Sequence, residues 1–113
     1  MKEVKAIIQP FMLEKVLDEL REYSGLPGLT VSEVIGWGKS QAEDAGEIVS
    51  EGGSAFAKKT KLEIVVADEH LESIADIITR AAQTGRPGDG KIFIFDVLEA
   101  VKIRTGERGG DAI

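Results

Sequence analysis

A β-strand followed by an amphipathic helix occurs twice in this chain. Residues 3–9 and residues 61–67 have the pattern of strands, and Pro10 ends the first of them. The apolar helix positions that follow are Leu13, Val16, Leu17 and Leu20 in the first copy, and Leu71, Ile74, Ala75 and Ile78 in the second. Because strands and helices are both displaced by 58 residues, the sequence predicts a duplicated strand–helix unit.

Each unit needs a further strand, and glycine-containing turns precede two candidates, residues 29–37 and residues 91–97. The resulting order, β-α-β-β-α-β, predicts an α+β, ferredoxin-like fold, with one antiparallel four-stranded sheet and both helices on one of its faces. A chain of 113 residues has the length of one domain, so we assign residues 1–113 to a single one.

The helices of such a fold leave the second face of the sheet uncovered. The strand at 91–97 nevertheless has apolar residues on both of its faces, namely Ile92, Phe93, Ile94, Phe95 and Val97. An apolar sheet face without a cover is typical of a subunit interface, and we therefore expect an oligomer.

The composition excludes several kinds of site. With no cysteine and one histidine, the chain has no disulfide, no thiolate nucleophile and no cysteine or multi-histidine metal centre. A formal net charge of −6 disfavours nonspecific binding to nucleic acid or anionic lipid. No apolar run approaches the roughly 18 residues of a spanning helix, so we expect a cytoplasmic protein without membrane insertion. Ser, Asp and His residues do not cluster as in a catalytic site, which predicts a protein that is not an enzyme.

Two segments lack a clear strand or helix pattern. Residues 38–58 are rich in glycine and acidic residues, and an unpatterned stretch of this length is typical of a flexible functional loop. A short strand is predicted near residues 100–104, followed by a polar, glycine-rich tail at residues 105–113. We expect His70 to be solvated and Trp37 to pack in the core or anchor a turn.

Residues 84–91 resemble part of a phosphate-binding loop. Gly85, Gly90 and Lys91 match the spacing of a P-loop, but Ile92 replaces its Ser or Thr, and this loop leads from a helix into a strand. We therefore reject a P-loop. Glycine backbone N–H groups beside a lysine remain suited to an anion, whereas the alternative is a helix end and turn built on Gly88 and Gly90.

A second cationic segment follows the last strand. Alternation along residues 100–104 places Lys102 and Arg104 on the same side of the chain, where both reach one polyphosphate. The alternative is a solvated edge strand that is protected by its charge. Two cationic, glycine-rich segments in an acidic chain favour binding of a nucleotide or another phosphate compound.

These motifs together resemble the PII nitrogen-regulatory signal-transduction proteins. The resemblance covers nearly the whole chain and is carried by Ala6-Ile7-Ile8-Gln9-Pro10-Phe11, Leu29-Thr30-Val31-Ser32-Glu33-Val34, Gly36-Trp37-Gly38, Leu62-Glu63-Ile64-Val65-Val66, Thr84-Gly85, Gly88-Asp89-Gly90-Lys91-Ile92-Phe93 and Ile103-Arg104-Thr105-Gly106-Glu107-Arg108-Gly109. It implies a ferredoxin-like homotrimer that binds ATP or ADP in the clefts between subunits.

The resemblance also implies roles for individual residues. The phosphate loop consists of Gly88, Asp89, Gly90 and Lys91, and the C-terminal segment brings Lys102, Ile103 and Arg104 to the nucleotide. Positions near the base and ribose are Thr30, Glu63 and Val65, whereas Gly38 and Lys39 lie at the root of the long loop beside the phosphates.

The long loop departs from the family pattern. Lys39 and Lys102 stand where arginine is usual, which keeps the charge but loses the bidentate hydrogen bonds. Typical members hold Mg²⁺ and 2-oxoglutarate with a glutamine, which is replaced here by Ser40 with Gln41 one place later. This change argues against 2-oxoglutarate sensing, although Lys59 matches the lysine that contacts its carboxylate.

Known modification sites differ as well. Gly52 replaces the tyrosine that is uridylylated in many bacteria, and Ser50 matches a serine that is phosphorylated in some relatives. The loop resembles that of divergent branches found beside metal-efflux transporters.

The sequence thus predicts a trimeric sensor in which ATP and ADP compete and bias residues 38–58. That loop then contacts a target protein, either a membrane transporter or a metabolic enzyme. An alternative is a ferredoxin-like trimer for divalent-metal tolerance or metal-efflux regulation, and a third hypothesis is a slow ATPase, for which no base is positioned.

Overall fold

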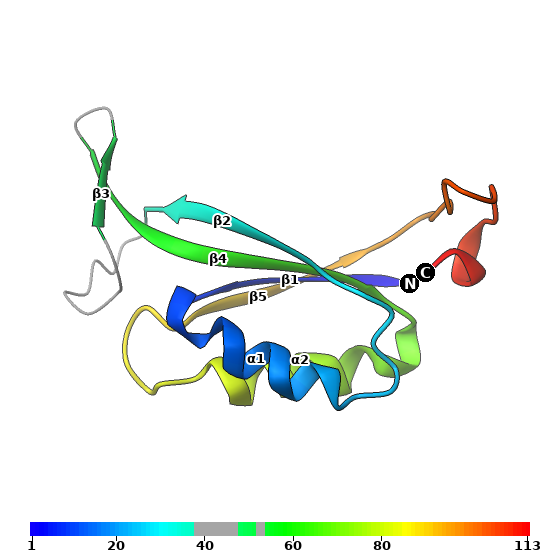
Figure 1. The fold of residues 1–113 in the computed structure, drawn as a ribbon, viewed down its shortest axis with the longest axis horizontal. Coiled ribbons are helices and arrows are strands. Elements are labelled where there is room, and N and C mark those ends of the chain that lie inside the picture. The colour runs from blue at the N-terminus through cyan, green and yellow to red at the C-terminus, as the bar shows by residue number, and fades with distance from the viewer. Residues whose placement is uncertain (38–47, 52–53) are drawn as a thin grey trace.

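A computed structural model describes residues 1–37, 48–51 and 54–113 of the chain (Figure 1). The strands are β1 (Lys2–Ile8), β2 (Thr30–Gly36), β3 (Ile48–Glu51), β4 (Ser54–Val66) and β5 (Gly90–Asp96). The helices are α1 (Leu13–Arg21) and α2 (Leu71–Ala82). Single 3-10 turns occupy Pro10–Met12, Asp68–His70 and Gly109–Ala112.

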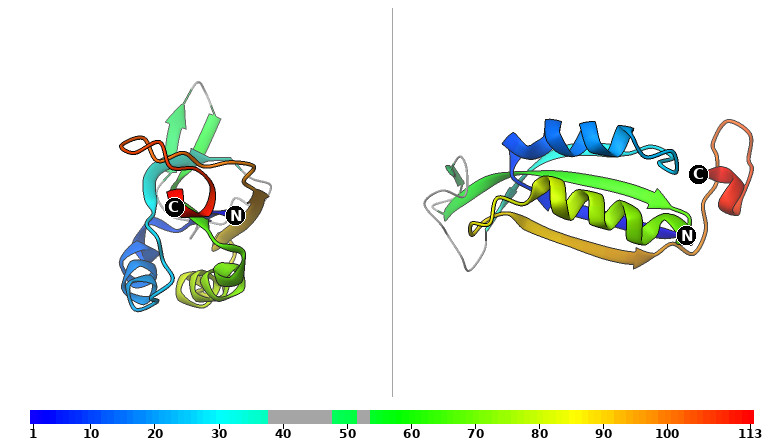
Figure 2. Two further views of the ribbon diagram at one scale, coloured as in Figure 1. Left: turned by 90° about the vertical axis from the view of Figure 1, so that its right-hand side faces the viewer. Right: turned by 90° about the horizontal axis from the view of Figure 1, so that it is seen from below.

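The main sheet is antiparallel, with the strand order β2-β4-β1-β5, and both helices cover the same face (Figure 2). Each helix follows its strand through a 3-10 turn, Pro10–Met12 before α1 and Asp68–His70 before α2. The predicted duplication and the ferredoxin-like arrangement are therefore confirmed.

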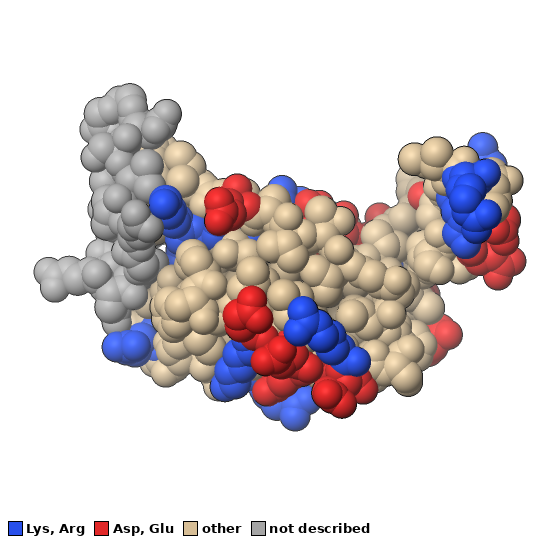
Figure 3. Space-filling view, viewed as in Figure 1, with Lys and Arg blue, Asp and Glu red and all other residues tan. Residues whose placement is uncertain are grey.

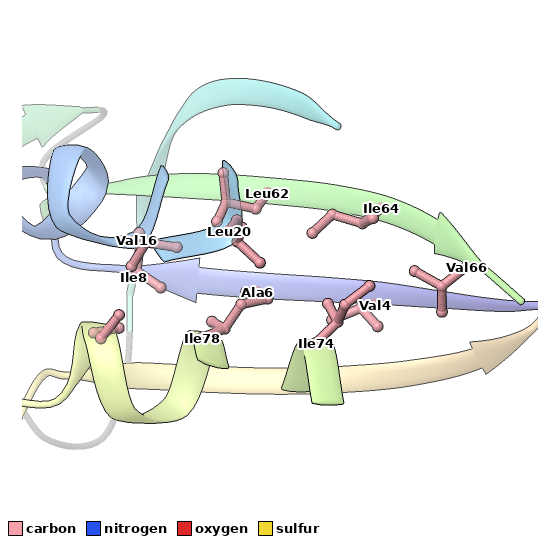
Figure 4. Close-up of a cluster of buried hydrophobic side chains, with 12 residues drawn as sticks. Val4, Ala6, Ile8, Val16, Leu20, Leu62, Ile64, Val66, Ile74 and Ile78 are labelled. Atoms are coloured by element: carbon pink, nitrogen blue, oxygen red, sulfur yellow. The ribbon is translucent and has the colours of Figure 1, made fainter. Parts of the chain in front are cut away.

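The core lies between the sheet and the two helices (Figure 4). Alternate residues of β1 and β4 point toward the helices, because successive side chains of a strand face opposite sides. The buried strand residues include Val4, Ala6, Ile8, Leu62, Ile64 and Val66, and those of the helices include Val16, Leu20, Ile74 and Ile78. These helix positions are the ones that the 3.6-residue period selects.

Two irregular segments differ from what their sequences indicate. The sequence of residues 38–58 has no strand period, but β3 and the beginning of β4 form a hairpin there, in which Ile48 pairs with Ala57. The prediction of a strand at residues 100–104 is wrong. The Lys102 N–H donates to the Glu107 carbonyl at 2.8 Å, and the Gly106 N–H donates to the Lys102 carbonyl at 2.7 Å. These local bonds close a turn where the alternating sequence had indicated an extended chain.

The sheet face opposite the helices carries exposed apolar side chains. Phe93 pairs with Lys5 and Phe95 with Glu3, on the side away from the buried Val4 and Ala6. Phe93 and Phe95 are 47% and 45% exposed. The apolar open face that the sequence predicted is therefore present in the described chain.

His70 and Trp37 differ from expectation. His70 is half-buried, with Nδ1 2.6 Å from the Tyr23 hydroxyl and its ring edge-on to the tyrosine. Trp37 is 65% exposed beyond the end of β2 and does not pack in the core. The chain's single tyrosine and single histidine thus join the segment after α1 to the segment before α2.

The Tyr23–His70 contact predicts a measurable effect on stability. Tyr23→Phe keeps the ring but removes the hydroxyl, and we expect the free energy of unfolding to fall by about 1 kcal/mol. Urea denaturation followed by circular dichroism measures this change. An unchanged midpoint would show that water replaces the hydroxyl without cost.

Candidate functional site

The predicted phosphate loop joins α2 to β5 at the end of the sheet where β1 finishes. Gly90 pairs with Ile8 and has a φ of +107°. A Cβ atom at this position would lie 1.7 Å from the Ile7 carbonyl oxygen. Both its backbone conformation and its close approach to β1 therefore require glycine.

The Asp89 carboxylate organises this loop from within. Its Oδ2 accepts hydrogen bonds from the backbone N–H groups of Thr84 at 2.8 Å and Gly85 at 2.9 Å. The Thr84 hydroxyl donates to Oδ1. The bond from the Thr84 side chain, with help from the two backbone bonds and the nearby Arg86, holds the pKa of Asp89 below its usual value.

Lys59 reaches the same loop from β4. Its Nζ donates to the Gly88 carbonyl at 2.8 Å, and the side chain is half-buried. Burial lowers the pKa of the Lys59 ammonium, an effect that the Asp89 carboxylate partly opposes. The candidate effector residue Lys59 therefore lies beside the predicted phosphate loop. The sequence alone did not indicate that this lysine and this loop are neighbours.

A second group of predicted residues lines a hollow of about 480 Å³ on the open side of the sheet. Thr30 and Glu63 pair across β2 and β4, and Val65 lies two residues further along β4. The remaining lining residues are Glu3, Pro27, Gly28, Leu29, Ala112 and Ile113. The structure thus brings the three base and ribose candidates together. The contribution of Ala112 and Ile113 was missed, since no sequence pattern links the C-terminal turn to this hollow.

The cationic C-terminal segment lies at the far end of β5 from the phosphate loop (Figure 1). Figure 3 shows basic and acidic side chains together on this projecting segment. Lys102 is half-buried, with Nζ 3.8 Å from Glu107 Oε1, while Ile103 and Arg104 are exposed on the turn. Lys102 and Arg104 therefore do not share one side of a strand, and within one chain they do not meet Lys91.

Comparison with known proteins gives the family. The model of the family described as "Nitrogen regulatory protein P-II" matches residues 1–107. The chain belongs to the P-II family. It is 47% identical to the nitrogen regulatory protein P-II of Rhodospirillum rubrum and 48% identical to that of Bradyrhizobium diazoefficiens. It is 45% identical to nitrogen regulatory protein P-II 1 of Escherichia coli, and each alignment covers all of both chains.

Several predicted positions of this P-II chain have no described geometry. Gly38, Lys39, Ser40 and Gln41 lie outside the described residues. Ser50 belongs to β3, where its backbone pairs with Ala55. The roles assigned to these positions stay predictions.

The described residues of the P-II chain also bear on metal binding and on membrane insertion. Within residues 1–37, 48–51 and 54–113, no three His, Asp or Glu side chains are grouped so that they could hold a metal ion. The described helices include none that is long and apolar enough to cross a membrane.

Proposed function

We propose that this P-II chain is a regulatory protein that binds ATP or ADP in clefts between the subunits of a homotrimer in the cytoplasm. The observation that carries this proposal is the separation of the two cationic segments at opposite ends of β5. A polyphosphate meets both segments when the C-terminal turn of one subunit lies beside the phosphate loop of the next. The apolar face with Phe93 and Phe95 supplies the surface for such an assembly.

Each cleft would take one part of its site from each of two subunits. The hollow of Thr30, Glu63 and Val65, suited to a base and ribose, is also lined by the C-terminal residues Ala112 and Ile113, so it lies at the same end of the sheet as the turn with Lys102 and Arg104. One subunit would supply this hollow and these two cations, and the next subunit would supply the phosphate loop with Gly88, Gly90 and Lys91.

Nucleotide binding regulates a target protein through residues 38–58. A ligand shifts a conformational equilibrium only by its difference in affinity between the two states, so ATP and ADP must stabilise different arrangements of this segment. The target is a membrane transporter or a metabolic enzyme, and the relatives' name points to nitrogen regulation. Mg²⁺ accompanies ATP, whereas Ser40 in place of the family glutamine argues against 2-oxoglutarate as the effector.

Calorimetry with ATP, ADP and AMP tests the proposal. We expect heat with ATP and ADP at sub-millimolar concentrations, and weaker binding of AMP because it has fewer phosphate oxygens for the cationic groups. ATP should displace bound ADP, and sedimentation equilibrium should give the mass of a trimer. No heat with any of the three nucleotides would refute nucleotide sensing, and a monomer at all concentrations would refute the shared cleft.

A further inference from the structure

The carboxylate of Asp89 is unexpected in a loop that is proposed to hold an anion. A free carboxylate at this position would repel a phosphate group, since like charges disfavour one another at short range. It also has no described partners with which to bind a metal ion, because no metal-binding group of three acidic or histidine side chains occurs in the described chain. Its role must therefore come from the bonds that it makes within the protein.

Those bonds hold the beginning of the loop. Oδ2 accepts from two successive backbone N–H groups, of Thr84 and Gly85, and Oδ1 accepts from the Thr84 hydroxyl. The Thr84 oxygen in turn accepts the Arg86 N–H at 3.2 Å. The negative charge of Asp89 is thus directed at N–H and O–H groups inside the loop, which leaves less of it to oppose a ligand.

The end of the loop is held by other elements. Lys59 Nζ on β4 donates to the Gly88 carbonyl, and Gly90 packs against the Ile7 carbonyl of β1. Lys91 follows Gly90 directly in β5. The position of the Lys91 backbone is therefore fixed when both ends of the loop are held. Binding then does not have to order the loop first, which lowers the entropic cost of binding.

We infer that Asp89 is a positioning residue, whose carboxylate shapes residues 84–91 for the polyphosphate without contacting it. This inference rests on the proposed nucleotide function. A positioning role in the phosphate loop affects ligands with several phosphates only, whereas a general structural role would affect every ligand. The base and ribose hollow around Thr30, Glu63 and Val65 makes no use of Asp89, so only ligands with several phosphates depend on this carboxylate.

Asp89→Asn tests the inference with little change of shape. The asparagine oxygen can still accept from the Thr84 and Gly85 N–H groups, but its amide nitrogen cannot accept from the Thr84 hydroxyl, and the loss of the negative charge weakens the bonds that remain. We expect the Kd values for ADP and ATP to rise about tenfold and the Kd for adenosine to stay unchanged. Asp76→Asn, at an exposed position on α2, is the matched control and should leave all three Kd values unchanged.

Hydrogen exchange and a second variant complete the test. The amides of Thr84 and Gly85 should exchange faster in Asp89→Asn than in the unchanged protein. Thr84→Val should weaken ATP binding less than Asp89→Asn, and the double variant should be no worse than Asp89→Asn alone, because both changes break one network. Thr84→Val also provides the measurement if Asp89→Asn does not fold.

The possible failures are distinguishable. Absence of ATP binding by the unchanged protein would refute the proposed function, and the phosphate role of Asp89 with it. ATP binding that Asp89→Asn leaves unaltered would overturn the inference alone. Equal weakening of adenosine and ATP would also overturn it, because Asp89 would then act on the whole protein or on the base.

Discussion

Lys91→Ala is expected to weaken binding of ADP and ATP roughly fiftyfold by calorimetry. An ammonium–phosphate hydrogen bond contributes about 2 kcal/mol or more, and Lys91 begins β5 directly after the loop held by Asp89 and Lys59. Lys15→Ala is the matched control, because Lys15 is exposed on α1. Equal affinity of Lys91→Ala and the unchanged protein would remove this lysine from the site.

The same variant tests whether two subunits build each site. Lys91→Ala lacks the phosphate-loop cation and Arg104→Ala lacks a cation of the C-terminal turn, so each alone should bind ATP weakly. Trimers re-formed from equal amounts of both should recover high affinity in about one quarter of the clefts, where an intact loop meets an intact turn. No recovery would mean that the two segments do not meet between subunits.

Gly90→Ala is expected to lower the free energy of unfolding by about 3 kcal/mol or more and to abolish detectable nucleotide binding. A Cβ atom there would lie 1.7 Å from the Ile7 carbonyl oxygen, and the φ of +107° disfavours any side chain. The end of β1 and the beginning of β5 would have to separate. Denaturation in urea and calorimetry with ATP measure the two effects.

Gly85→Ala separates crowding from backbone conformation. Gly85 also has a positive φ, of +84°, but a Cβ atom there would have no neighbour within 4 Å. We expect a cost of about 1 kcal/mol, the usual penalty for a left-handed residue other than glycine. An equal loss of stability in both variants would show that contact with Ile7 is not the cause at Gly90.

The regular part of the fold could be predicted from local patterns. Buried residues alternate along a strand, as Val4 and Ala6 do in β1. They recur about every 3.6 residues along a helix, as Ile74 and Ile78 do in α2. Both periods can be recognised in the sequence. The repeat at 58 residues then restricted the topology to one sheet with two helices on one face. These conclusions did not require knowledge of which distant residues are in contact.

The errors occurred where distant or turn-closing contacts decide the structure. β4 begins as early as Ser54 because its first residues pair with β3. The sequence of residues 38–58 has no period that predicts this hairpin. Residues 100–104 alternate like a strand, but the bonds between Lys102, Gly106 and Glu107 close a turn instead. His70 lies among polar residues in sequence, and only the fold brings Tyr23 to it.

For the site, the sequence by itself determined which residue types are available: a glycine loop with Lys91, a cationic segment with Lys102 and Arg104, and Thr30, Glu63 and Val65 on two strands. Only the tertiary structure decided how they are placed. In the structure, Lys59 donates a hydrogen bond to the Gly88 carbonyl, and the Asp89 carboxylate accepts hydrogen bonds from its own loop. The two cationic segments lie at opposite ends of β5. Residue type follows from the local chain, whereas these contacts follow from the antiparallel pairing of strands that are far apart in sequence.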